Sequence, residues 1–282
     1  MTLKEKSKLE KRFVLAFYGL DGSQNAAEGF FRTTTEWFRE LGYSPDQLGV
    51  TGKGFGDKVG SFRRLNSRLE KTGFADVQGF SIRKSKSEAL NSMILFDVSA
   101  IFSGADDDGG YGIVAVPSPI ASKPVWGPIA EKIIQSLHPN YGIGYERMLG
   151  EGPTLYALGI NLDNGTVRTG EAYEQALNVS KWCYCGMPKR VYHDGLLRDV
   201  YPWNFLTQSQ LTRQVGELPL ADWIRQDETR GSLSEFCNGV SLWEIPEPNI
   251  PAVRRVLWDA GAIFDWKRFL PPQGKAASPD DF

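Results

Sequence analysis

The sequence predicts an α+β fold, in which a mixed, largely antiparallel sheet packs against amphipathic helices as a two-layer sandwich. Apolar residues alternate along one long stretch and would share one face of a strand: Ile94, Phe96, Val98, Ala100 and Phe102. A turn-forming run at 106–110 joins this stretch to a second apolar segment at 111–116, which predicts a β-hairpin over 92–116. Between residues 126 and 137, apolar residues recur instead at helical spacing. Strands and helices mixed in this way, with a hairpin among them, are typical of the α+β class.

Residues 12–165 are expected to form the core domain. The glycines at 52, 54, 56 and 60 indicate a flexible loop ahead of the second helix. In order, the domain is predicted to contain a strand at 13–18, helices at 27–41 and 59–69, strands at 74–83, 92–102 and 111–116, a helix at 126–137, and strands at 141–147 and 154–160. The predicted core residues are Phe30, Phe38, Ile94, Phe96, Val98, Phe102, Trp126, Ile129 and Ile133.

Beyond residue 165 the pattern is less regular. Residues 166–266 are expected to be a helical and irregular part that packs on the same core, with helices at 171–184, 207–214 and 219–227, the second capped by Thr207. This part closes with a predicted β-α-β unit, made of a strand at 240–245, a helix at 250–260 and a strand at 262–266. Residues 267–282, rich in Pro, Lys, Ser and Asp, are expected to be a loose tail.

Composition excludes several classes of function. The 282 residues include 32 Lys and Arg against 34 Asp and Glu, a net charge of −2, so the chain lacks the basic excess that binds duplex nucleic acid. No apolar stretch approaches the roughly 20 residues that span a bilayer. The basic start is followed by a short apolar run without a cleavage site, so it is not interpreted as a signal peptide. We therefore expect a cytoplasmic location, with neither nucleic acid nor membrane as a partner.

The sequence lacks a complete motif for binding a nucleotide or zinc, and no cofactor is expected. The glycine-rich run at 52–60 lacks a buried strand before it and lacks P-loop spacing, so it is interpreted as an ordinary loop. Cys183, Cys185, His193 and Cys237 could in principle hold zinc, but two cysteines separated by one residue on a helix point to different sides. Small buried thiols are the favoured interpretation.

Three adjacent carboxylates, Asp106, Asp107 and Asp108, stand at the tip of the predicted hairpin. They lack the alternating oxygens and the final Glu of a calcium-binding loop. One interpretation is a solvated turn. The other is an acidic contact for a basic protein partner, because exposed carboxylates steer association.

The segment 193–206 is unusual because large aromatic residues stand beside Arg, Asp and Asn in an irregular stretch. As a structural element it could wrap the sheet, with Arg198 pairing with a carboxylate and Asn204 binding backbone groups. As an interface it would present Arg198, Trp203 and Asn204 to a partner, since aromatic residues beside Arg are typical of interface anchors.

The residues at 141–147 and 152–159, together with the segment 193–206, resemble a group of bacterial uncharacterised proteins. That group is similar to immunity proteins of polymorphic and type VI toxin systems. The resemblance extends over residues 12–265. It implies a cytoplasmic α+β protein that binds and neutralises a cognate toxin and has no chemistry of its own. No catalytic motif defines these families, so no family binding residue is carried over.

The alternative, from a different class, is a hydrolase-like enzyme with a pocket formed by a carboxylate and His193 near residues 193–206. The neighbouring Asp194 could orient His193 as a base. No nucleophile accompanies this pair, so the sequence favours a binding protein over an enzyme.

Overall fold

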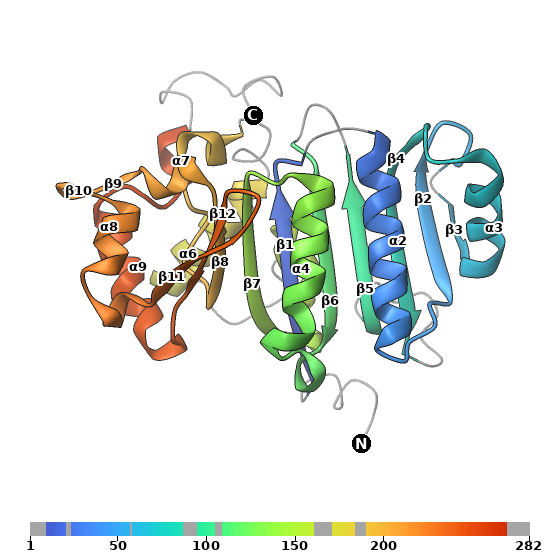
Figure 1. Ribbon diagram of the computed structural model, residues 1–282, viewed down its shortest axis with the longest axis horizontal. Helices are drawn as coiled ribbons and strands as arrows, with labels where there is room; N and C mark the ends of the chain where they lie inside the picture. Colours follow the sequence, from blue (N-terminus) through green and yellow to red (C-terminus); the bar gives the residue numbers. More distant parts are fainter. Residues whose placement is uncertain are drawn as a thin grey trace. The chain divides into compact units, whose positions relative to one another are not determined.

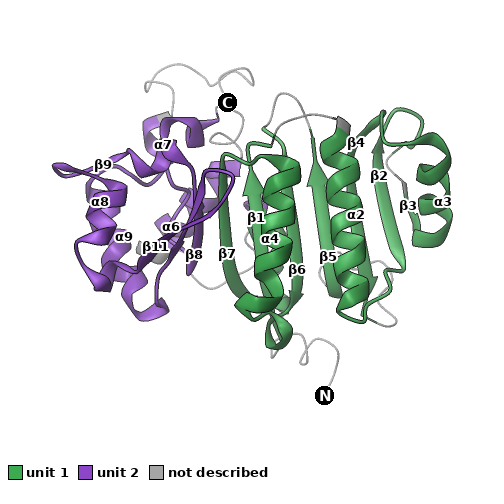
Figure 2. Cartoon of the chain, in the orientation of Figure 1, with its two compact units in different colours: residues 1–157 green, residues 158–282 purple. Residues whose placement is uncertain are grey.

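The computed structural model describes residues 10–20, 24–56, 58–86, 95–104, 109–160, 171–183 and 190–269. The chain divides into two compact units, residues 1–157 (unit 1) and residues 158–282 (unit 2), which Figure 2 shows in different colours. The predicted α+β class, with a largely antiparallel sheet and amphipathic helices, is confirmed. None of the helices in the described ranges combines the length and the apolar character that crossing a bilayer demands.

The described strands of unit 1 form an antiparallel sheet. The strands follow one another across it in the order β7 (Tyr141–Met148), β1 (Lys11–Tyr18), β6 (Tyr111–Pro117), β5 (Phe96–Ser103), β4 (Val77–Ser85), β2 (Gln47–Gly52) and β3 (Lys58–Ser61). The predicted hairpin is confirmed by the antiparallel pairing of β5 with β6, in which Phe102 lies opposite Gly112. Asp106, Asp107 and Asp108 lie outside the described residues.

Strand β1 lies between β6 and β7 and is covered on both faces. Its residues from Phe13 to Tyr18 are all buried. Phe13 stacks on Trp126 of α4 (Lys123–Leu137), with ring centroids 5.6 Å apart. Tyr18 donates a hydrogen bond of 2.9 Å from its hydroxyl to the carbonyl of Ala157, in α5 (Pro153–Ala157). Because successive side chains point to opposite faces, a strand covered on both faces needs the uninterrupted apolar run found here.

Two helices, α2 (Gln24–Glu40) and α4, lie side by side over one face of the sheet (Figure 1). Phe30 of α2 packs on Phe80 of the sheet, with ring centroids 5.9 Å apart. At Gly112 of β6, an added Cβ would lie 2.8 Å from Leu137 and 3.1 Å from Phe30, so glycine permits the close approach of both helices. The predicted core is confirmed for its described members, while Ile94 lies outside the described residues.

The remaining elements of unit 1 are short. They are α3 (Phe62–Thr72), which packs against β2 and β3, and the single turns η1 (Ser118–Ile120) and η2 (Leu149–Glu151). The strand predicted at 154–160 is wrong, because this segment begins within helix α5, where Pro153 suits the first helical turn. The prediction that no buried strand precedes the glycine-rich run at 52–60 is also wrong, although residues 53–55 of this run form a turn. Strand β2 precedes it, buries Leu48 and Val50, and pairs with β3.

In unit 2, strands pair antiparallel in the order β11 (Ser232–Cys237), β12 (Val240–Glu244) and β8 (Trp203–Leu206), and β9 (Gln214–Val215) and β10 (Leu218–Pro219) form a hairpin. Its described helices are α6 (Glu171–Lys181), α7 (Gln208–Leu211), α8 (Leu220–Arg225) and α9 (Ile250–Asp259). Single 3-10 turns are η4 (Val191–Asp194), η5 (Glu228–Arg230), η6 (Glu247–Asn249) and η7 (Trp266–Phe269). Thr207 caps α7 as predicted, in a capping box with Gln210.

The predicted β-α-β unit is formed only in part. β12 and α9 are present, but residues 262–266 are not a strand, since Ile263 makes an isolated parallel bridge to Leu197. Strands β8 and β11 were not predicted. Of the predicted tail, residues 270–282 lie outside the described residues.

Candidate functional site

A pocket of about 400 Å³ opens in unit 2 between α6 and α9, and we call it the α6–α9 pocket. Helix α6 and helix α9 each contribute one wall, and Asp199 and two residues after α9 complete the lining. The lining residues are Glu174, Gln175, Asn178, Asp199, Arg254, Arg255, Trp258, Asp259, Ile263 and Lys267.

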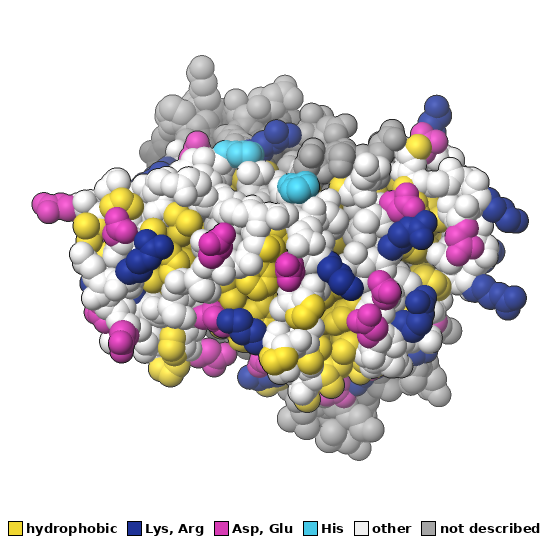
Figure 3. All heavy atoms as spheres, in the orientation of Figure 1, with side chains coloured by type: hydrophobic (Ala, Val, Ile, Leu, Met, Phe, Trp, Pro, Cys, Tyr) yellow, Lys and Arg dark blue, Asp and Glu magenta, His cyan; other side chains and the backbone are white. Residues whose placement is uncertain are grey.

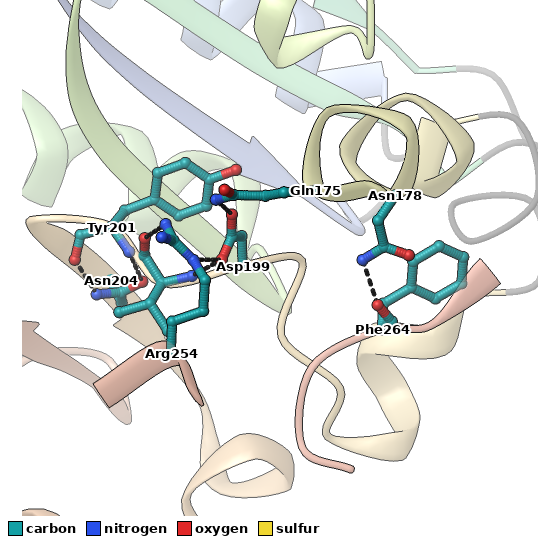
Figure 4. Close-up of polar contacts among 8 residues, drawn as sticks. Gln175, Asn178, Asp199, Tyr201, Asn204, Arg254 and Phe264 are labelled. Atoms are coloured by element: carbon teal, nitrogen blue, oxygen red, sulfur yellow. Dashed lines mark hydrogen bonds and ion pairs between the residues drawn. The ribbon is translucent and has the colours of Figure 1, made fainter. Parts of the chain in front are cut away.

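Asp199 joins the two walls of this pocket (Figure 4). Its side chain is 5% exposed. One carboxylate oxygen, Oδ1, accepts hydrogen bonds from Arg254 Nε at 2.6 Å and from the backbone N–H of Val200 at 2.7 Å. The other, Oδ2, accepts a hydrogen bond of 2.6 Å from Gln175 Nε2 on α6. Because its two oxygens bind a side chain of α6 and a side chain of α9, Asp199 fixes α9 to α6.

Asn178 makes a second link from α6 to the chain that follows α9. Its Nδ2 donates to the carbonyl of Phe264 (Figure 4). Its Oδ1 accepts a hydrogen bond of 3.0 Å from the backbone N–H of Trp266. Both functional groups of this buried amide therefore have partners. The pocket is a rigid feature, because the segments around it are bonded to one another.

The mouth of the pocket carries an exposed tryptophan between charged residues. Val253 and Leu257 form the buried face of α9, so Arg255, Trp258 and Asp259 face outward. Trp258 is 42% exposed, which is a high fraction for so large an apolar side chain. Tryptophan and arginine are among the residue types that contribute most of the binding energy in protein–protein interfaces.

The residues singled out from the sequence lie elsewhere in unit 2 or outside the described residues. Arg198 and Asn204 are both 0% exposed, so neither side chain reaches a partner in this conformation. Asn204 accepts a hydrogen bond of 3.2 Å from the N–H of Tyr201 and donates to its carbonyl at 2.6 Å, in line with the structural interpretation of the segment. Trp203 is half-buried and does not line the α6–α9 pocket.

The candidates for chemistry are not gathered at the pocket either. His193 lies exposed on η4, where its ring is 4.9 Å from that of Tyr192, and it does not line the α6–α9 pocket. Cys185 lies outside the described residues. Among the residues that the structure describes, no three His, Cys, Asp or Glu side chains lie close enough together to hold a metal ion.

Trp258, Arg255 and Asp199 were not predicted as site residues. The periodicity of α9 could have indicated Trp258, because this large apolar residue falls outside the apolar stripe that contains Val253 and Leu257. On the face drawn in Figure 3, Lys and Arg side chains lie among Asp and Glu side chains over the described surface. That distribution differs from the continuous basic stripe of a nucleic-acid-binding surface.

Comparison with known proteins gives a likeness of fold. No protein-family model matches the chain, and no curated protein matches its sequence. A solved structure with a similar fold is the Pseudomonas aeruginosa T6SS protein PA0821, where T6SS denotes the type VI secretion system. The TM-score is 0.57 and the sequence identity 14%, over 90% of this chain and 76% of that chain.

Proposed function

We propose that this chain is a cytoplasmic immunity protein, which neutralises a cognate type VI toxin by binding to its surface. The proposed contact surface is the outward face of α9 together with the mouth of the α6–α9 pocket. The observation that carries the proposal is Trp258, 42% exposed at the mouth of a pocket of about 400 Å³, with Arg255 on the same helix.

The construction of the pocket supports binding. The hydrogen bonds of Asp199 and Asn178 hold α6, α9 and the segment after α9 in one arrangement before any partner arrives. A surface ordered in advance loses less conformational entropy on association, so more of the contact energy appears as affinity.

The chemistry of the pocket supports binding over catalysis. The buried carboxylate, Asp199, already accepts three hydrogen bonds, and His193 lies outside the pocket lining. The three donors are groups of this chain that link structural elements, and a general base must instead lie within hydrogen-bond reach of a substrate proton. The fold likeness to a T6SS protein is in keeping with a role in that system.

The test begins with capture of a partner from the native host by the tagged chain, followed by identification by mass spectrometry. The captured protein is then expressed in a laboratory bacterium, alone and together with the chain. The proposal expects growth arrest by the captured protein and recovery of growth when the wild-type chain is present. A captured protein that is harmless, or whose toxicity the chain does not relieve, contradicts the proposal.

The Trp258→Ala variant locates the surface. We expect it to weaken binding by about 30-fold or more, as truncation of an interface hot spot does. Val59→Ala is the matched control, since Val59 is an apolar side chain 59% exposed in unit 1. His193→Ala should retain full protection, and loss of protection in that variant would favour the enzymatic alternative. Protection that survives Trp258→Ala unchanged would show that the α9 surface is not the contact.

A further inference from the structure

A second hollow, of about 320 Å³, lies against a different face of α9, and we call it the α8–α9 groove. Helix α9 contributes one wall, and α8, η5 and η6 contribute the rest. The lining residues are Trp223, Asp227, Thr229, Arg230, Pro248, Asn249, Ala252, Val253 and Val256. Val256 is 44% exposed, so the groove presents apolar surface to the outside.

The floor and the rim of the groove are fixed by hydrogen bonds. The Arg230 guanidinium lies over the Trp223 ring, 4.4 Å from its centroid, and donates from Nη1 to the Trp223 carbonyl at 2.6 Å. Asn249 Nδ2 donates to the carbonyl of Thr229 at 2.8 Å, which ties η6 to η5. The groove therefore exists before any ligand enters it.

One acidic residue lines this groove, and two more adjoin its lining residues in the sequence. Asp227 accepts hydrogen bonds from Thr229, at 2.7 Å from the hydroxyl and 2.9 Å from the N–H, and these hydrogen bonds lower the pKa of Asp227. Glu228 and Glu247 adjoin lining residues in the sequence and are exposed, and their carboxylates make no hydrogen bond or ion pair with a described residue. Arg230 lies 3.9 Å from Asp227, so the charges within the lining are balanced and those of Glu228 and Glu247 are not.

The segment that supplies the walls of the groove other than α9 is acidic, whereas α9 itself carries Arg254 and Arg255 against Asp259. Residues 214–249 contain seven carboxylates, Glu217, Asp222, Asp227, Glu228, Glu235, Glu244 and Glu247, against the two arginines Arg225 and Arg230, a net charge of −5. The entire chain has a net charge of only −2. A potential of this sign attracts a cationic partner and repels an anionic one.

We propose that the α8–α9 groove receives a lysine or arginine side chain from a basic surface of the protein partner. The aliphatic stem would pack on Pro248, Ala252 and Val256, and the cation would meet Glu228 and Glu247. Long basic side chains combine an apolar stem with a charged end, which matches an apolar wall with an acidic rim. A purely apolar side chain would gain nothing from the two free carboxylates. The inference rests on the proposed function for the existence of a protein partner, and it adds the chemistry of that partner.

One arm of the test needs no partner. The blocked peptide acetyl-Gly-Lys-Gly-amide is titrated up to about 10 mM into the isotope-labelled chain, and amide shifts are followed by NMR. The lysine peptide is expected to shift the signals of Thr229, Asn249 and Val256. The peptide with norleucine in place of lysine, and the Glu228→Gln/Glu247→Gln variant with the lysine peptide, are expected to show much smaller shifts. Equal shifts with norleucine, unchanged shifts in the variant, or no lysine-dependent shift at all would overturn the inference.

The other arm uses the captured partner. Glu228→Gln/Glu247→Gln is expected to slow association by about 10-fold at about 50 mM NaCl and to flatten the salt dependence, as loss of electrostatic steering does. It should also speed dissociation, because the cation loses its counter-charges. The control, Glu217→Gln/Glu235→Gln, removes two exposed carboxylates of the same segment that do not adjoin lining residues, and it should leave the dissociation rate unchanged.

The two proposals fail in different ways. If Trp258→Ala abolishes binding while the groove variant binds with unchanged rates, the proposed function stands and the groove inference is wrong. If spermidine shifts the groove signals and the partner does not displace it, the groove binds a free cation and the inference is again wrong.

Discussion

Replacing Asp199 with alanine is expected to lower the free energy of unfolding of unit 2 by about 3 kcal/mol. The side chain is 5% exposed and carries the link between α6 and α9. Its removal leaves three donors without an acceptor, namely Arg254 Nε, Gln175 Nε2 and the Val200 N–H. Breaking a buried ion pair by removing one partner costs about 3–5 kcal/mol. Because the Arg254 side chain is 25% exposed, water can solvate it in part, which puts the expected loss at the lower end.

The matched control is Asp222→Ala in the same unit. Asp222 pairs with Arg225 at 3.4 Å, but the two side chains are 58% and 63% exposed. An ion pair in water contributes about 0.2–1 kcal/mol, so the control should lose much less stability. The double variant Asp199→Ala/Arg254→Met should recover part of the loss of Asp199→Ala, because it also removes the charge that Asp199 had neutralised.

Urea unfolding followed by tryptophan fluorescence measures these differences. Six of the eight tryptophans lie in unit 2, so the signal reports mainly on that unit: Trp182, Trp203, Trp223, Trp243, Trp258 and Trp266. A loss for Asp199→Ala no larger than that of Asp222→Ala would show that water already solvates the pair. The reasoning that the pocket is a rigid feature would then be wrong.

Three further predictions concern the rest of the chain. Ile133→Ala in α4, where the side chain is 0% exposed, should cost about 2–5 kcal/mol in the same urea experiment, and a cost below about 1 kcal/mol would contradict the described core. Tyr18→Phe should cost about 1 kcal/mol by losing its bond to Ala157, whereas Tyr192→Phe should cost nothing, because the buried Tyr192 hydroxyl makes no hydrogen bond to a described residue. Burial raises the pKa of Glu10, but its bonds to Lys86 and Arg12 outweigh burial and lower the pKa below 4.5. The stabilising contribution of Glu10 should therefore be present at neutral pH and lost as the pH falls below about 4.5. In Glu10→Gln, the urea concentration at half-unfolding should fall less steeply between neutral and acid pH than in the wild type.

Local patterns in the sequence were sufficient for most of unit 1. The alternation from Phe96 to Phe102 and the helical stripe from Trp126 to Leu137 each reflect burial against a neighbouring layer, which is the property that periodicity reports. The failures have local causes. Strand β2 buries only Leu48 and Val50 with glycine between them, which is too short a pattern to identify a strand. Residues 154–160 contain Thr, Leu and Tyr, which suit a strand, yet Pro153 starts a helix there.

The candidate site could not be predicted in the same way. Asp199 and Arg254 are 55 positions apart, and Gln175 lies 24 positions before Asp199. No periodicity relates residues at such separations, because the chain between them brings them together only through the tertiary fold. The sequence did mark 193–206 as a segment with an unusual set of polar residues, and Asp199 lies within it. Arg254, which binds that carboxylate, lies on α9, and this helix was predicted only from its apolar stripe.

The position of β1 in the sheet bears on the kinetics of folding. Phe13 pairs with Val116 on one side and with Glu146 on the other, both more than one hundred residues later in the chain. During synthesis the apolar run from Phe13 to Tyr18 is therefore made long before either strand that will flank it. Pairings between distant segments form slowly, because a large loop must close before any contact is gained. The pairing of β1 with β6 and β7 is therefore completed late, and until then a strand with six consecutive apolar residues that are buried in the fold is open to aggregation or to chaperones.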